Sequence, residues 1–282
     1  MQTYTERLDI QMKYKDDELK KLQETEIEIL RDVARVCEEN NIQYFSVGGT
    51  TLGAIRHNGF IPWDDDIDIG MLRDDYEKFI RIAPEKLSKG FTLTHFINAP
   101  SSPTYYAKVR KDGTEFVEKS VEKLNIHHGV FIDIMPYDKV PENEREREKY
   151  CRKAKLWNQL YIAKTVWTST FLPSKHKWLL NCIRAVLHVL MIPISKDYLF
   201  KKTDQAMRSF NGSDSHMVSS RGLKPFTCMI EDLLPPVKHD FNGLSIEIPA
   251  NADKVLKAQY GDYMKLPPEE KRYSHAPVKL KL

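Results

Sequence analysis

The spacing of hydrophobic and polar residues predicts alternating helices and short strands in the first half of the chain. Apolar side chains recur at helical spacing over residues 17–40, with Glu, Lys and Arg between them, and this predicts an amphipathic helix. Short apolar runs predict strands over residues 42–47, 61–70, 91–96, 105–109 and 130–135. Helices are expected over 52–57 and 73–82, the second ending near Pro84, and Pro136 is expected to close the last strand.

The second half has a different pattern. A long charged helical stretch is expected over 145–168, an apolar segment over 178–192, and helices over 196–210 and 250–260. The tail from residue 225 is rich in Pro and Asn-Gly turn chemistry. This order of elements predicts an α+β fold, with a mixed-sheet core, flanking helices and a mostly helical second half.

Composition then narrows the class of protein. The 282 residues are 41% hydrophobic and 29% charged, which is ordinary for a globular chain, and the net charge is only +3. Bulk charge therefore gives no reason to expect a nucleic-acid partner. The four cysteines form no CxxC pair, which argues against a zinc site and favours a reduced, cytoplasmic location. The N-terminal residues lack the apolar run of a signal peptide.

The most unusual stretch places four carboxylates within five positions, Asp64 to Asp68, inside an otherwise apolar run. On a strand, Asp66 and Asp68 would share one face with Cα atoms about 6.5–7 Å apart. Asp133, inside another apolar run, would add a third carboxylate if the two strands are neighbours. Such a group suits Mg²⁺ with a phosphorylated substrate, because Mg²⁺ prefers carboxylate and phosphate oxygens. The alternatives are a solvated acidic loop and a structural, hydrogen-bonded Asp133.

A glycine pair precedes these acids. Gly48 and Gly49 lie at a strand-to-helix turn, where backbone N–H groups and the helix N-terminus favour phosphate. Other side chains expected to contact the phosphates are those of Thr50, Thr51, Arg56, Lys108 and Arg110.

The segment from Gly48 to Gly70, GGTTLGAIRHNGFIPWDDDIDIG, resembles the signature of the LicD family. That family includes bacterial phosphocholine transferases and the related fukutin-type phospho-alditol transferases. The resemblance continues over 109–114 and 129–136, and over 260–268 near the C-terminus. It departs from the family pattern at Phe241-Asn242-Gly243, where an acid would be expected in the middle.

The resemblance implies a nucleotidyltransferase-like fold and an enzyme that moves a phospho-substituent from a CDP-linked donor to a sugar hydroxyl. It implies that Asp66, Asp68 and Asp133 are the catalytic and metal-binding acids, with Mg²⁺ or Mn²⁺ as the cofactor. It also implies that Gly48 and Gly49 form the phosphate-side turn. Asp133 or Asp64 would accept the proton of the attacking hydroxyl.

Three domain-level segments follow from this interpretation. Residues 1–140 would form the nucleotidyltransferase-like catalytic core, 141–224 a helical region, and 225–282 a segment packing back on the core. The donor would be CDP-choline-like and the acceptor a cell-surface glycan, free or lipid-linked. Two other functions remain open: transfer of the nucleotide itself to a small alcohol or sugar, and an inactive binding module on the same fold.

The apolar segment over 178–194 also leaves two interpretations open. Basic residues flank or interrupt it: Lys175, Lys177, Arg184, Lys196, Lys201 and Lys202. It is either a buried core helix or a helix in an anionic membrane interface, with residues 175–202 making a peripheral contact at the inner membrane face. Its polar residues and its length argue against a membrane-spanning helix.

Overall fold

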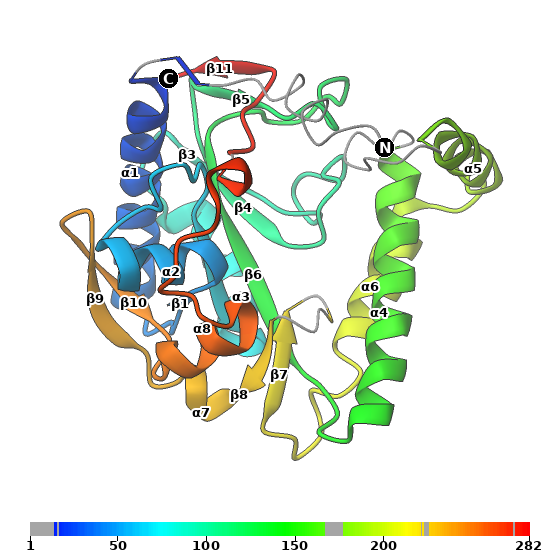
Figure 1. The fold of residues 1–282 in the computed structure, drawn as a ribbon. Coiled ribbons are helices and arrows are strands. Elements are labelled where there is room, and N and C mark those ends of the chain that lie inside the picture. Colours follow the sequence, from blue (N-terminus) through cyan, green and yellow to red (C-terminus); the bar gives the residue numbers. More distant parts are fainter. Residues whose placement is uncertain (1–13, 16, 167–176, 221, 223–225, 273) are drawn as a thin grey trace.

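A seven-stranded mixed sheet forms the centre of the molecule (Figure 1). The computed structural model describes residues 14–15, 17–166, 177–220, 222, 226–272 and 274–282. Five strands follow the order β1 (Phe45–Ser46), β2 (Asp68–Leu72), β6 (Phe131–Lys139), β4 (Ala107–Lys111) and β3 (Phe91–Thr94). β7 (Met217–Ser220) pairs with the later part of β6, and β8 (Thr227–Met229) pairs with β7. β2 and β6 are parallel, whereas the other pairs of this sheet are antiparallel.

Helices from both ends of the chain cover the sheet. α1 (Glu18–Glu39) packs on β4 and β6, and α3 (Arg73–Lys86) packs on β2, β3 and β6. α2 (Gly48–His57) lies between β2 and α8 (Ala252–Tyr260). The buried apolar residues of α1 share one hydrophobic core with Ile69 of β2 and with Ile132 and Ile134 of β6. Each such side chain contributes about 1.5–3 kcal/mol to folding.

The middle of the chain forms a helical layer on the other side of the molecule from α1 (Figure 1). α4 (Glu144–Thr165) packs along α6 (Lys196–Met207), and α5 (Lys177–Leu190) contacts α4. The remaining elements are α7 (Ile230–Leu233), a 3₁₀ helix (Glu269–Lys271), the hairpin of β9 (Val237–Phe241) with β10 (Leu244–Ile248), and β5 (Glu115–Val117) paired with β11 (Lys279–Lys281).

The expected α+β fold is confirmed, and the long helices fall close to their predicted bounds. The predicted three-part division of the chain stays a prediction, although α8 and β11 do lie against elements of the first 140 residues. No helix of the described ranges combines the length and the apolar character needed to cross a bilayer.

Several predicted element bounds are wrong; the strand expected over 42–47, for example, spans only Phe45–Ser46. The strand expected over 61–70 begins only at Asp68, so strand alternation does not apply to Asp66. α2 begins at Gly48 and not at residue 52. β6 continues through Pro136, because β4 pairs with β6 only as far as Ile134 and β7 only from Tyr137. Pro136 therefore lies where no antiparallel neighbour needs its missing N–H.

Other differences concern prolines and the tail. Pro84 lies inside α3 and does not end it. The tail forms strands that were not predicted, and Asn242-Gly243, both with positive φ, make the tight turn between β9 and β10. Asn242, where the family pattern led us to expect an acid, accepts a hydrogen bond from the Phe60 N–H at 2.9 Å.

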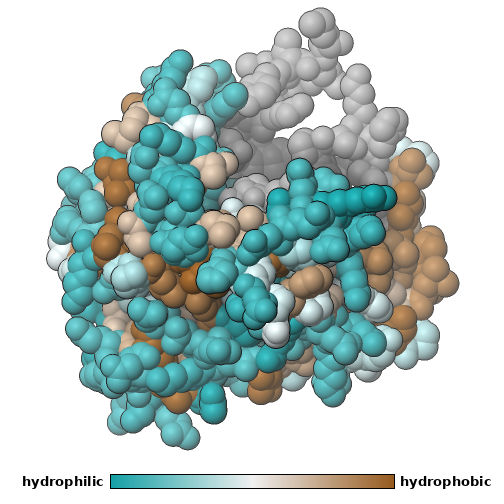
Figure 2. Space-filling model, turned by 90° about the horizontal axis from the view of Figure 1, so that it is seen from below, coloured by the Kyte–Doolittle hydropathy of each residue, from teal (hydrophilic) through white to brown (hydrophobic). Residues whose placement is uncertain are grey.

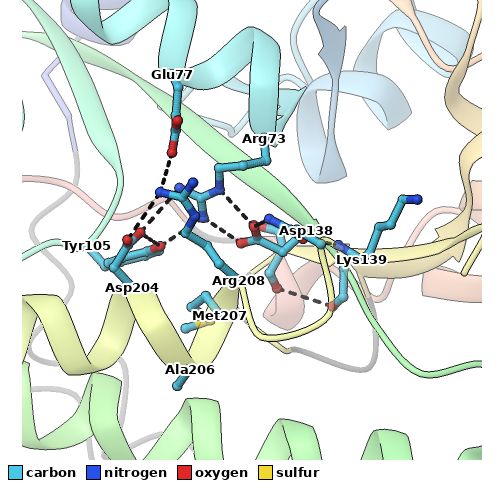
Figure 3. Close-up of polar contacts among 12 residues, drawn as sticks. Arg73, Glu77, Tyr105, Asp138, Lys139, Asp204, Ala206, Met207 and Arg208 are labelled. Carbon is cyan, nitrogen blue, oxygen red and sulfur yellow. Dashed lines mark hydrogen bonds and ion pairs between the residues drawn. The ribbon is translucent and has the colours of Figure 1, made fainter. Parts of the chain in front are cut away.

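A buried ion pair joins the sheet to the helical layer (Figure 3). Arg73 at the start of α3 donates two hydrogen bonds to Asp138 of β6, at 2.8 and 2.5 Å, and both residues are buried. Arg73 also donates to the Tyr105 hydroxyl, which in turn donates to Asp204 of α6 at 2.7 Å. The guanidinium thus has partners on β6, on α6 and in the segment before β4, which fixes α6 relative to the sheet.

We expect Asp138→Asn to lower the free energy of unfolding by about 3 kcal/mol, because a buried guanidinium loses its charged partner. Urea denaturation followed by fluorescence would measure this. Glu77→Gln is the matched control, since Glu77 pairs with Arg208 at the partly exposed edge of the same network and should cost less than about 1 kcal/mol. Equal losses for the two variants would contradict the central role of the Arg73–Asp138 pair.

Candidate active site

Charged side chains from three neighbouring strands meet on one face of the sheet. Asp68 of β2 is the register partner of Asp133 of β6, and Asp133 is the register partner of Lys108 of β4. Register partners point to the same face of a sheet. Lys108 Nζ donates to Asp133 Oδ1 at 2.6 Å. Asp66 lies near enough for the Asp133 charge to raise its pKa. The structure therefore brings the three predicted acids together.

The glycine pair lies directly against these acids. A Cβ atom on Gly49 would lie only 2.6 Å from Asp64 Oδ2, and one on Gly48 would lie 4.0 Å from Asp68 Oδ2. Gly48 also has a φ of +55°, which side chains with a Cβ rarely adopt. Since α2 starts at Gly48, its N-terminus and partial positive charge face the carboxylates. The same place would suit a phosphate group.

The acids are crowded and poorly hydrated. Burial raises the pKa of Asp64 to about 8, and the charges of Asp66 and Asp65 add to that shift. Burial likewise raises the pKa of Asp66 to about 6, with further contributions from Asp65 and Asp133. The side chains around these carboxyls therefore supply too little positive charge to keep both of them ionised at neutral pH.

A further buried acid, on α1, was missed by the sequence analysis. Glu26 of α1 is 2% exposed, and its Oε2 atom has no hydrogen-bond partner among the described residues. Burial raises its pKa well above the ordinary value, and the charges of Asp66 and Asp65 raise it further. A signal was present, because Glu26 falls on the same helical face as the buried Leu22, Ile29 and Leu30, where a surface Glu would not be expected.

The three predicted cations are placed differently from one another. Lys108 is buried, bound to Asp133, with Nζ only 3.4 Å from the centroid of the Phe131 ring. Arg110 lies two residues further along β4 and donates to the Gly129 carbonyl at 2.8 Å. Arg56, in the last turn of α2, donates to the Tyr263 carbonyl at 2.7 Å. Lys108 therefore lies in the acid cluster, whereas Arg110 and Arg56 donate hydrogen bonds to backbone carbonyls.

The two threonines have internal partners. Thr50 Oγ1 accepts a hydrogen bond from the Asp68 N–H at 2.8 Å, which ties α2 to the start of β2. Thr51 is fully buried and its hydroxyl lies 2.8 Å from that of Ser46. These contacts position the glycine turn beside Asp68, while phosphate binding by the two hydroxyls stays a prediction.

The C-terminal region closes the site. The His275 N–H and the Tyr14 hydroxyl both donate to Asp65, which fixes the position of this buried acid. The Tyr260 hydroxyl of α8 lies near Gly48, and its pKa is raised to about 12 by burial and by the charges of Asp64 and Asp68. Tyr260 thus forms a wall of the same site.

The donor set suits a hard divalent cation only in part. No three His, Cys, Asp or Glu side chains within the described ranges form a group that could hold a metal as they stand, and Lys108 engages Asp133. Asp66 and Asp68 remain as two carboxylate ligands, and Mg²⁺ commonly takes one or two carboxylates with substrate phosphate oxygens. The orphaned Glu26 Oε2 and the raised pKa of Asp66 show that negative charge is crowded here, and a divalent cation would relieve it. Metal binding stays a prediction.

Comparison with known proteins bears on the same segment. Residues 41–164 match the family model described as "LicD/FKTN/FKRP, nucleotidyltransferase domain". The chain carries a LicD-family domain. The "Lipopolysaccharide cholinephosphotransferase LicD" of Haemophilus influenzae is 28% identical over 253 residues, covering 85% of this chain and 89% of that protein. The "Ribitol 5-phosphate transferase FKRP" of Homo sapiens is 44% identical over 48 residues, covering 17% of this chain and 10% of that protein.

The LicD-family domain contains most of the candidate site. All ten predicted site residues, from Gly48 to Asp133, lie within the matched range 41–164. Glu26, Tyr260 and His275 lie outside it, on α1 and in the C-terminal region. Segments on both sides of the LicD-family domain thus complete the walls of the acid cluster.

The raised pKa values make stability depend on pH. Without bound metal, the folded protein keeps protons on Asp64 and Asp66 that the unfolded chain releases above about pH 4. The stability from these protons is present at low pH and is lost as the pH rises through about 6 and about 8. We expect the melting temperature in EDTA to fall from pH 5 to pH 9.

The Asp66→Asn variant should show a clearly smaller fall in the same calorimetric scan, because it has no proton to lose at that position. Asp74→Asn is the control, since Asp74 is exposed on α3 and should leave the fall unchanged. A melting temperature in wild-type protein that is flat or rises over this pH range would show that the acids are not crowded in solution.

Proposed function

We propose that this LicD-family protein is an enzyme that transfers a phospho-substituent, such as phosphocholine, from a CDP-linked donor to a sugar hydroxyl of a cell-surface glycan, with Mg²⁺ bound at the acid cluster. The observation that carries the proposal is the register of Asp68 with Asp133 beside the N-terminus of α2. The relatives support the reaction class, because the bacterial one is named a cholinephosphotransferase and the human one a ribitol 5-phosphate transferase.

Each group of residues at the site would have its own role in the reaction. The first turn of α2, with its glycine pair, binds the donor diphosphate without steric hindrance and offers a favourable dipole. Asp66 and Asp68 would hold the divalent cation, which supplies charge neutralisation for the phosphates and the leaving group. Tyr260 limits the site from the side of α8.

The chemical step is a displacement at phosphorus. The acceptor hydroxyl oxygen attacks the phosphorus that bears the transferred group, and the bond from this phosphorus to the bridging oxygen breaks, so CMP leaves with that oxygen. Asp133 accepts the proton of the attacking hydroxyl, and its hydrogen bond to Lys108 orients the carboxylate. The product is a phosphodiester on the glycan.

The main alternative is transfer of the nucleotide itself, which the description "nucleotidyltransferase domain" favours. The released product separates the two reactions. Phospho-substituent transfer from CDP-choline releases CMP, whereas nucleotide transfer from CTP releases pyrophosphate. We expect the protein to release CMP from CDP-choline in the presence of Mg²⁺. The rate of release should increase when glycan from the source cells is added.

We expect Asp66→Asn and Asp68→Asn each to lower kcat for CMP release by at least about 100-fold, because the charge that neutralises the phosphates is lost with the metal ligand. Asp74→Asn should stay within about twofold of wild type. The assay would measure CMP and labelled glycan together, on variants whose melting temperatures show that they are folded.

Two results would overturn the proposal. Undiminished transfer by both variants would move the chemistry away from this site. Pyrophosphate release from CTP, with no CMP released from CDP-choline, would establish the nucleotide-transfer alternative.

A further inference from the structure

The helix α5 and the turn after it expose an apolar surface that no described part of the chain covers. Trp178, Val186, Val189, Leu190 and Ile192 are each 58–69% exposed. Further side chains of α5 with at least a third of their surface exposed are those of Leu179, Ile183 and Leu187. We call these eight residues the α5 surface. Figure 2 shows apolar side chains gathered over this edge of the molecule.

The exposure of α5 argues against the first of the two interpretations of the apolar segment, a buried core helix. A buried core helix is excluded for the described part of α5, because these side chains face outward. Residues 175 and 176 of the segment predicted to contact a membrane lie outside the described residues. Large contiguous apolar patches are rare on monomeric proteins and mark a surface that meets a partner.

The end of α5 is nevertheless firmly attached. Lys164 of α4 donates to the carbonyls of Met191 and Ile192, at 2.8 and 3.0 Å. Met191 is buried with Tyr161 and Leu199 in the cluster between α4 and α6. The outward face is therefore held in place by its C-terminal anchor, and it is presented at the edge of the molecule farthest from α1 (Figure 1).

Charge identifies the kind of partner. Residues 150–202 contain ten Lys or Arg and one Asp, a net charge of +9, so the rest of the chain carries −6 within the total of +3. α5 itself contains no acid. Arg152, Lys153 and Lys155 are exposed on α4, the helix that α5 contacts. A second copy of this surface would bring like charges together, whereas an anionic surface would attract them.

An exposed tryptophan also favours a membrane surface as the partner. Trp178, near the start of α5, is 69% exposed. Tryptophan rings favour the boundary between lipid head groups and acyl chains. An exposed apolar helix face with cationic surroundings is the pattern of a helix lying in a membrane interface.

We propose that the α5 surface docks the protein on an anionic lipid bilayer, with its apolar side chains in the interface and the basic residues of α4 to α6 at the head groups. This inference does not depend on the transferase chemistry. If that chemistry holds, docking would bring the site to an acceptor carried on lipid.

Flotation with vesicles tests the docking. The protein should float with phosphatidylcholine vesicles that contain 30% phosphatidylglycerol, and at least tenfold less with pure phosphatidylcholine vesicles. Raising NaCl from 0.1 to 0.5 M should weaken binding several-fold, because salt screens attraction between exposed charges. Val186→Asp should reduce the bound fraction at least tenfold.

Val237→Asp is the matched control, because Val237 is a similar exposed apolar residue on β9, away from α5 (Figure 1). It should float as wild type does. Val186→Asp should keep the wild-type melting temperature and the wild-type rate of CMP release with a lipid-free acceptor. Loss of docking can thus be told apart from loss of folding or of the proposed activity.

Three outcomes would overturn the proposal. The protein could stay soluble with the anionic vesicles, or Val186→Asp could bind them as wild type does. Alternatively, light scattering could show a dimer that Val186→Asp dissociates, with no vesicle binding by either protein. The last result would assign the α5 surface to contact between two copies of the chain.

Discussion

Mutual repulsion among buried carboxylates is the constraint on which this structure depends. The register of β2 with β6 places Asp68 beside Asp133, the loop before β2 adds Asp64 and Asp66, and α1 adds Glu26 from behind. Burial makes each charge costly, and proximity makes the cost larger. The fold offsets part of this with Lys108 and with the N-terminus of α2. The negative charge that these groups do not offset would favour a divalent cation, bound together with the phosphates of a donor.

The rest of the fold maintains this arrangement. The apolar face of α1 and the isoleucines of β2 and β6 form the core beneath the acids. The Arg73–Asp138 pair connects α3 and β6 to α6, so the helical layer is fixed on the strand that carries Asp133. Tyr14 and the segment at His275 both bind Asp65, which brings the two ends of the described chain to the same loop. Chain segments far apart in sequence thus build a single site.

Much of this could be predicted from local pattern, and the failures have physical causes. Helical periodicity gave α1, α4, α5, α6 and α8 because each has a continuous amphipathic face. The acid-rich segment indicated the site, because carboxylates inside an apolar run need cations or hydrogen-bond donors to offset their charge. The start of β2 was misplaced, because the apolar residues before Asp68 are buried in an irregular loop. β7 to β10 were not predicted, because short strands depend on cross-strand partners that a single sequence does not reveal.

The candidate site, like the fold, was predicted only in part from the sequence. The sequence pointed to the three acids, the glycine turn and the cations. It could not show that Lys108 binds Asp133, that Arg56 is directed to the Tyr263 carbonyl, or that Glu26 and Tyr260 complete the walls. Those relations come from strand register and from contacts between the two ends of the chain. The sequence also could not show that α5 is exposed, because an apolar helix has the same sequence pattern in a core as in a membrane interface.

The most direct test of the central claim is a crystal structure of the protein with CDP and Mn²⁺, read by anomalous scattering. The account predicts a manganese peak bound by the Asp66 and Asp68 carboxylates, with the CDP diphosphate between it and the first turn of α2. A diphosphate bound elsewhere, or at this turn with no metal on either aspartate, would contradict it.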